Sequence, residues 1–155
     1  MEIKMVLFMP RDAASVPVSR QVLDSCLETL GVTLDTRTDI ALALGEACAN
    51  VVQHAGPGVE YEVLATAKEG RCVIEVVSTV NRDEAPVPAG ASLPSPSSEP
   101  VPATAEHGRG LKIIDAVTDN LQLTGDDRDG TTLRFEKALS WVPGAAGEHL
   151  FSAQS

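Results

Sequence analysis

The sequence predicts an α/β fold, a two-layer sandwich with a mixed, mostly antiparallel sheet and helices on one face. Two observations lead to this prediction. The expected elements follow the order strand, helix, helix, two strands, long loop, helix, two strands, so the strands come in hairpins. A long pattern of apolar residues at helical spacing, at 39–54, indicates a helix with one face suited to burial. The hairpins exclude a doubly wound dinucleotide-binding fold.

The first elements have recognisable ends in the sequence. Residues 3–9 are apolar enough for an opening strand. Ser15 is suited to cap the helix that follows, and Gly31 supplies a left-handed stop for it. The next helix is expected to start at Thr36 and Asp39, which resemble a capping box with Asp in place of the usual Glu.

Two pairs of strands follow these helices. The Gly-Pro-Gly sequence at 56–58 ends the second helix and precedes the first pair. Alternating apolar residues predict four strands, and helical spacing predicts one short helix between the pairs. The expected strands are 59–67, 71–80, 120–124 and 131–139, and the expected helix covers 111–117.

The chain is expected to form one domain over residues 1–140. Within it, residues 81–107 are rich in Pro and Ser and form a long loop in the position of a lid. Residues 141–155 are expected to be a tail. Its apolar end, Leu150 and Phe151, either docks on the domain or extends away from it.

Composition excludes several classes of function. The net charge of −10 argues against binding a nucleic-acid backbone, which needs clustered Lys and Arg, and suits either a basic partner protein or simple solubility. Cys26, Cys48 and Cys72 are isolated and odd in number, so we expect reduced core residues rather than disulfides or a zinc site. No segment resembles a membrane span or a signal peptide, and we expect a cytoplasmic protein.

Three polar residues lie on one face of the long central helix. Glu46, Asn50 and His54 are each four residues apart, so they stack on successive turns at the edge of the apolar arc. An ordinary polar helix flank would also produce this pattern. The spacing by itself therefore leaves both interpretations open.

A second candidate site is the sequence Gly108-Arg109-Gly110, which we expect to form a turn that opens a helix. Two glycines let backbone N–H groups approach a ligand, and the N-terminus of a helix attracts anions. Such a pattern alone is weak support for phosphate binding, because it also occurs at plain helix entries. The sequence contains no P-loop.

Taken together, these motifs resemble the GHKL ATPase superfamily, whose members share the Bergerat-type ATP-binding fold. The phrases LALGEACANVVQHAG, HGRGLKIIDAVTDNL and DGTTLRFEKAL are most similar to RsbW/SpoIIAB-type anti-sigma factors, which are serine-protein kinases. The resemblance covers about residues 16–139.

The resemblance implies a role for each candidate residue. Asn50 would hold Mg²⁺, and Glu46 would be the base that orients the attacking hydroxyl. Ser78 stands where the family has the aspartate that accepts the adenine amino group. The remaining nucleotide-binding residues implied by the resemblance are His54, His107, Gly108, Arg109, Gly110 and Thr131.

The resemblance also implies partners: a sigma factor and an anti-anti-sigma protein of the STAS type, as in bacterial partner switching, and a homodimer formed near the first strand. ATP and Mg²⁺ would be the cofactors. The motif Asp-x-Gly-x-Gly is degenerate here, because Ser78 replaces the aspartate and neither Val80 nor Arg82 is glycine. A catalytically inactive pseudokinase that sequesters its partner is therefore the alternative to an active kinase.

Two other interpretations are weaker. A sensor ATPase fragment of a histidine kinase is disfavoured because no phosphate-accepting helix precedes the first expected strand. A metal hydrolase that uses His54, His107 and the cysteines is disfavoured because their spacing matches no known ligand pattern.

Overall fold

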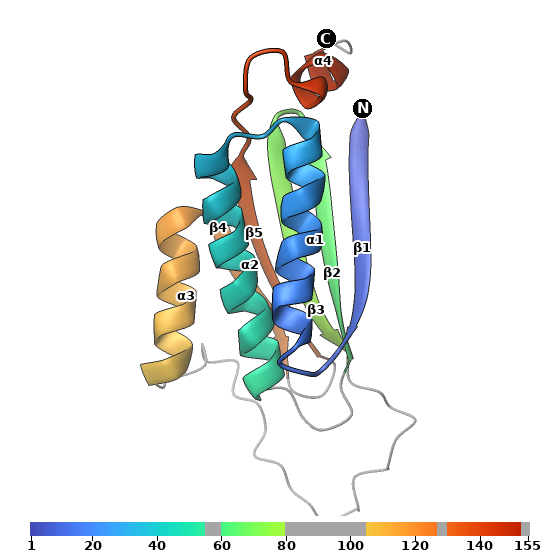
Figure 1. The fold of residues 1–155 in the computed structure, drawn as a ribbon. Coiled ribbons are helices and arrows are strands. Elements are labelled where there is room, and N and C mark those ends of the chain that lie inside the picture. Colours follow the sequence, from blue (N-terminus) through green and yellow to red (C-terminus); the bar gives the residue numbers. More distant parts are fainter. Residues whose placement is uncertain (55–59, 80–104, 127–129, 153–155) are drawn as a thin grey trace, which may run out of the picture.

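A single five-stranded sheet carries the fold, with helices against one of its faces (Figure 1). The computed structural model describes residues 1–54, 60–79, 105–126 and 130–152. Its elements in chain order are β1 (Glu2–Pro10), α1 (Ser15–Leu30), α2 (Leu34–His54), β2 (Glu60–Lys68), β3 (Arg71–Thr79), α3 (Ala105–Val117), β4 (Asp119–Asp126), β5 (Gly130–Ala138) and α4 (Ala146–Ser152).

The strand order is β1-β2-β3-β5-β4, and every pairing between neighbours is antiparallel. The helices α1, α2 and α3 lie side by side over one face, and α4 lies at one end (Figure 1). The predicted two-layer α/β sandwich with a mostly antiparallel sheet is thus confirmed. No helix in the described residues is long and apolar enough to cross a membrane.

Alternation along the strands creates the core. In β2, every second residue faces the helices and is buried, while the residues between them face the open side. Tyr61 and Val63 on β2 and Phe135 on β5 are fully buried. The β2–β3 hairpin is closed by Glu69 and Gly70, which have φ values of 52° and 75°. Positive φ at both positions is the geometry of a two-residue turn whose twist matches that of the strands.

The helix starts differ from the predicted ones. α1 begins at Ser15, but Ser15 is not its cap. Its hydroxyl donates to the carbonyl oxygen of Asp12 at 2.7 Å and also pairs with the hydroxyl of Tyr61, because Ser15 is buried between α1 and β2. α2 begins at Leu34, two residues before Thr36. Gly31, with φ 90°, ends α1 as predicted.

The tail docks on the domain. Trp141 forms a bridge with Val32, and the backbone N–H of Val142 donates to the carbonyl oxygen of Gly31 at 2.8 Å. The ring of Phe151 stacks on Trp141 with centroids 5.8 Å apart. Gly147 fits directly against the same ring, because a Cβ there would lie 2.3 Å from Trp141 Cζ3. Of the two outcomes left open for this tail, docking is the observed one.

Several sequence predictions lie outside the described residues. They are the Gly-Pro-Gly stop at 56–58, most of the turn that joins the last two strands, and the expected lid up to residue 104.

The cysteines fall into two groups. Cys48 and Cys72 are buried, and this burial raises the pKa of each thiol to about 12. Cys26 is exposed on α1, where its Sγ lies 3.9 Å from Sδ of Met5, so its prediction as a core residue is wrong. It sits on the flank of α1 that reaches over the edge strand β1, and the helix layer ends there.

We expect iodoacetamide at about pH 8 to modify only Cys26 in the folded chain, because the thiolate is the reactive form and the two buried thiols remain protonated and enclosed. Denaturant should expose all three cysteines. Mass spectrometry of peptides from native and unfolded samples measures both states, with Cys26→Ser as the control. Native labelling of Cys48 or Cys72 would contradict the buried positions of these residues.

Candidate functional site

The burial of α2 fixes the position of the first candidate residues. Glu46 and Asn50 are half-buried and lie one turn apart at the margin of the apolar face of the helix. The predicted amphipathic helix is confirmed, since the residues that face the sheet are almost fully buried. They are Ile40, Ala43, Leu44, Ala47, Cys48 and Val51.

The neighbouring helix α3 approaches α2 closely at Gly110. A Cβ atom at Gly110 would lie 3.2 Å from Oε2 of Glu46, which is tighter than ordinary carbon–oxygen contact. A glycine therefore lets the carboxylate of Glu46 rest against the backbone of α3. Two of the residues singled out in the sequence, Glu46 and Gly110, are in this way brought together.

The start of α3 differs from the prediction. The helix begins at Ala105, so Gly108, Arg109 and Gly110 lie inside its first turns and do not form a separate turn before it. Ala and Glu are strong helix formers, and residues 105 and 106 extend the helix at its N-terminal end, before the two glycines. Arg109 is exposed at this end of the helix.

A second pair of candidate residues meets across the β3–β5 ladder. Ser78 and Thr131 are directly opposite each other. The backbone N–H of Thr131 donates to Ser78 Oγ at 3.0 Å, and the two hydroxyl oxygens lie 2.8 Å apart. Ser78 is 6% exposed and faces the helix side of the sheet. The place expected for a carboxylate is thus occupied by a pair of hydroxyl groups.

Both pairs lie toward the same end of the molecule. The C-terminal ends of α2 and β3 and the N-terminal end of α3 point to one end of the sandwich, opposite α4 (Figure 1). The backbones of His54 and His107 belong to these ends of α2 and α3. The side chains of both histidines are outside the described part of the structure, so their predicted roles remain predictions.

The chemistry of this end of the molecule suits a magnesium-bound phosphate ligand. Among the described residues, neither Glu46 nor Asn50 uses its side chain in an ion pair or hydrogen bond with another described residue. Carboxylate and amide oxygens are ligands that Mg²⁺ accepts, and this metal usually keeps several waters. The N-terminus of α3 adds backbone N–H groups that favour anions. The residues present therefore fit a Mg²⁺–nucleotide ligand.

Sequence reasoning missed one residue that helps to place α3. Lys137 on β5 donates to Oδ2 of Asp39 on α2 at 3.0 Å and to the carbonyl oxygen of Val117, the last residue of α3, at 2.7 Å. A lysine at the end of a helix satisfies a free carbonyl and favours the helix dipole. The signal was in the sequence, because strand alternation puts Lys137 on the same face as the buried Leu133 and Phe135.

Comparison with known proteins agrees with this geometry. Residues 9–137 match the histidine kinase-like ATPase domain. The serine-protein kinase RsbW of Bacillus mycoides is 26% identical over 138 residues, which cover 88% of this chain and 85% of the relative. The protein of the same name in Bacillus cereus is 28% identical over 139 residues, with the same coverage. The chain therefore belongs to the histidine kinase-like ATPase domain family and is related to the RsbW serine-protein kinases.

Proposed function

We propose that the protein is an anti-sigma regulator that binds Mg·ATP and phosphorylates a serine of an anti-anti-sigma antagonist of the STAS type. The observation that carries this proposal is the contact of the Glu46 carboxylate with Gly110 at the start of α3. It sets a base beside the backbone that would hold the phosphates, which is the arrangement that phosphoryl transfer needs.

Each residue then has a defined task. Asn50 would hold the metal through its amide oxygen, and the backbone N–H groups in the first turn of α3, which begins at Ala105, would hold the phosphates. When bound, Mg²⁺ neutralises charge on the phosphate oxygens. Glu46 takes the proton of the serine hydroxyl while that oxygen bonds to the γ-phosphorus and the bond to the β-phosphate oxygen breaks, which leaves ADP and phosphoserine. Ser78 and Thr131 would contact the purine base of the nucleotide.

We propose that partner proteins bind over α1, next to the helix α2 that carries Glu46 and Asn50. Arg20 is exposed on α1, and its Nη1 lies 3.5 Å from the position of a Cβ on Gly45, the residue before Glu46. A cation at this place suits an acidic or phosphorylatable segment of a sigma factor or an antagonist.

A second candidate function is a pseudokinase that sequesters its partner without phosphoryl transfer. The pair of Ser78 and Thr131 favours it, because position 78, where the family has an aspartate, carries a hydroxyl group in place of a carboxylate. The loss of one charged hydrogen bond costs about 1.5–3 kcal/mol, or about one to two decades in affinity. Despite this weakening, an active kinase must still bind ATP at millimolar concentration. Titration with nucleotide therefore tests whether the kinase function is possible.

Isothermal titration with Mg·ATP should show binding by the wild-type chain, and Asn50→Ala should weaken it by about tenfold or more, because an oxygen ligand to the metal is lost. Gln53→Ala changes an exposed amide on the same helix and serves as the matched control. Absence of wild-type binding at millimolar nucleotide would leave the pseudokinase as the function. Unchanged affinity in Asn50→Ala would refute its role as metal ligand.

We expect Glu46→Gln to lower serine phosphorylation of an antagonist by about a hundredfold or more with little change in ATP affinity, because a general base contributes about 10²–10⁴ in rate. Gly110→Ala should also lower transfer, since its methyl group crowds Glu46, although alanine favours a helix. Phosphate incorporation and thermal melting measure both effects. Transfer at the wild-type rate in both variants would rule out Glu46 as the base.

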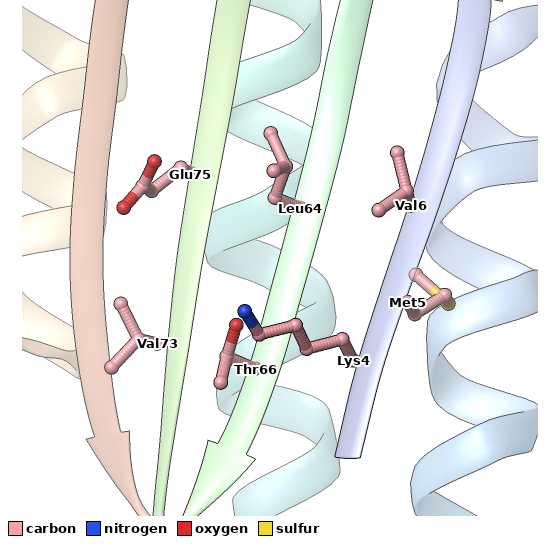
Figure 2. Close-up of a pocket in the computed structure, with 7 residues that line it drawn as sticks. All are labelled: Lys4, Met5, Val6, Leu64, Thr66, Val73 and Glu75. Carbon is pink, nitrogen blue, oxygen red and sulfur yellow. The ribbon is translucent and has the colours of Figure 1, made fainter. Parts of the chain in front are cut away.

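We also propose a homodimer through the face of the sheet that the helices leave open, next to β1. β1 is an edge strand, and Val6 and Phe8 on it are 46% and 71% exposed. A hollow of about 180 Å³ in this face is lined in part by Val6 and Leu64. Figure 2 shows these two side chains on the neighbouring strands β1 and β2. An exposed apolar patch of this kind is typical of an interaction surface.

The double variant Val6→Ser, Phe8→Ser should therefore be monomeric, because it removes the exposed apolar side chains of the edge strand. Size-exclusion chromatography with light scattering should give the molar mass of a dimer for the wild-type chain at micromolar concentration. Val18→Ser, which changes an exposed apolar residue on α1, is the control. A monomeric wild-type chain would refute the dimer.

A further inference from the structure

The hydroxyl pair of Ser78 and Thr131 differs from a carboxylate in what it offers a ligand. An ionised carboxylate has acceptors only, whereas each hydroxyl has one proton and two lone pairs. Ser78 Oγ accepts the backbone N–H of Thr131 at 3.0 Å, and one hydroxyl proton lies between the two oxygens at 2.8 Å. The pair still has one hydroxyl proton left.

That remaining proton has no good partner within the pair. The carbonyl oxygen of Thr131 lies 3.4 Å from Ser78 Oγ, at the long limit for a hydrogen bond. Among the described residues, no further group donates to Thr131 Oγ1, so this oxygen also keeps a lone pair for a ligand. Thr131 is half-buried, whereas Ser78 is almost enclosed, so the Thr131 hydroxyl is the more accessible of the two. The pair can thus donate to a ligand or accept from it, by rotation of its hydroxyl groups.

This property bears on which base the site takes. Adenine carries an amino group at position 6, which donates, and hypoxanthine and guanine carry a carbonyl oxygen there, which accepts. An acceptor-only carboxylate would pair with the first and repel the second. We infer that the Ser78–Thr131 pair accepts both, so the site takes purine nucleoside triphosphates without discrimination at position 6. This inference rests on the proposed function, which puts the base at Ser78 and Thr131.

Competition among ATP, ITP and GTP for the wild-type chain tests the inference. ITP differs from ATP only on the base edge that includes position 6, so the ratio of their dissociation constants isolates that edge. We expect ATP and ITP to bind within about threefold of each other, since a neutral hydrogen bond is made in both cases. GTP reports any further effect of the amino group at position 2. Titration calorimetry with Mg²⁺ measures all three.

Ser78→Asp should create a preference for ATP over ITP of about tenfold or more, because it supplies a charged acceptor. Thr124→Asp adds the same charge on the exposed strand β4 and should leave the ratio unchanged. A folded Ser78→Asp chain without the preference would overturn the assignment of Ser78 to the base. If this variant does not fold, the wild-type ratio alone decides.

The outcomes separate the inference from the proposed function. ATP binding with ITP about tenfold or more weaker in the wild type would overturn the inference and leave the proposed ATP-dependent function standing. Absence of binding by either nucleotide at millimolar concentration would overturn both. Comparable binding of both nucleotides supports the inference.

Discussion

The site depends on how completely α2 is buried against the sheet. Leu44, Ala47 and Cys48 have no exposed surface, so the rotation of the helix about its own axis is fixed by close packing. Each fully buried large side chain contributes about 1.5–3 kcal/mol relative to an exposed one. The orientation of Glu46 and Asn50 follows from this constraint, because they stand one turn apart on the rim of the same helix. Glu46 thereby comes to lie against Gly110 of α3.

The position of α3 is set at both of its ends. At its start, Gly110 permits the approach to Glu46, and at its end, Lys137 binds the carbonyl oxygen of Val117 and the carboxylate of Asp39. A glycine contact at one end and a charge-assisted hydrogen bond at the other hold two helices in register over the length of α3. These two contacts thereby set the position of the carboxylate of Glu46 relative to the start of α3.

Local signals predicted much of this fold. Strand alternation, the glycine at 31 and the apolar face of α2 are each decided by neighbouring residues, and these predictions held. Predictions failed where a tertiary contact outweighed local preference. Ser15 is a good cap in isolation, but its hydroxyl is bound to Tyr61, which is distant in sequence. The docking of the tail depends on a fit between Gly147 and Trp141 that no periodic pattern reveals.

The candidate site divides in the same way. The spacing of Glu46 and Asn50 follows from helix geometry and could be predicted from their numbers alone. The pairing of Ser78 with Thr131 depends on the register between β3 and β5, which the sequence does not specify. The hydrogen bond from Lys137 to the carbonyl oxygen of Val117 depends on where α3 ends. The two halves of the site also differ in charge. Glu46 carries a carboxylate, whereas Ser78 and Thr131 carry neutral hydroxyl groups.

The docked tail has a consequence for spectroscopy. The chain has one tryptophan, Trp141, and its indole is packed against Gly147 and Phe151 at the end of the molecule opposite the candidate site. Its intrinsic fluorescence therefore reports whether the tail is docked on the connection between α1 and α2. Emission from this indole is a natural probe of unfolding and of tail release, and it is insensitive to events beside Glu46. An optical signal for nucleotide requires a fluorophore introduced at the other end.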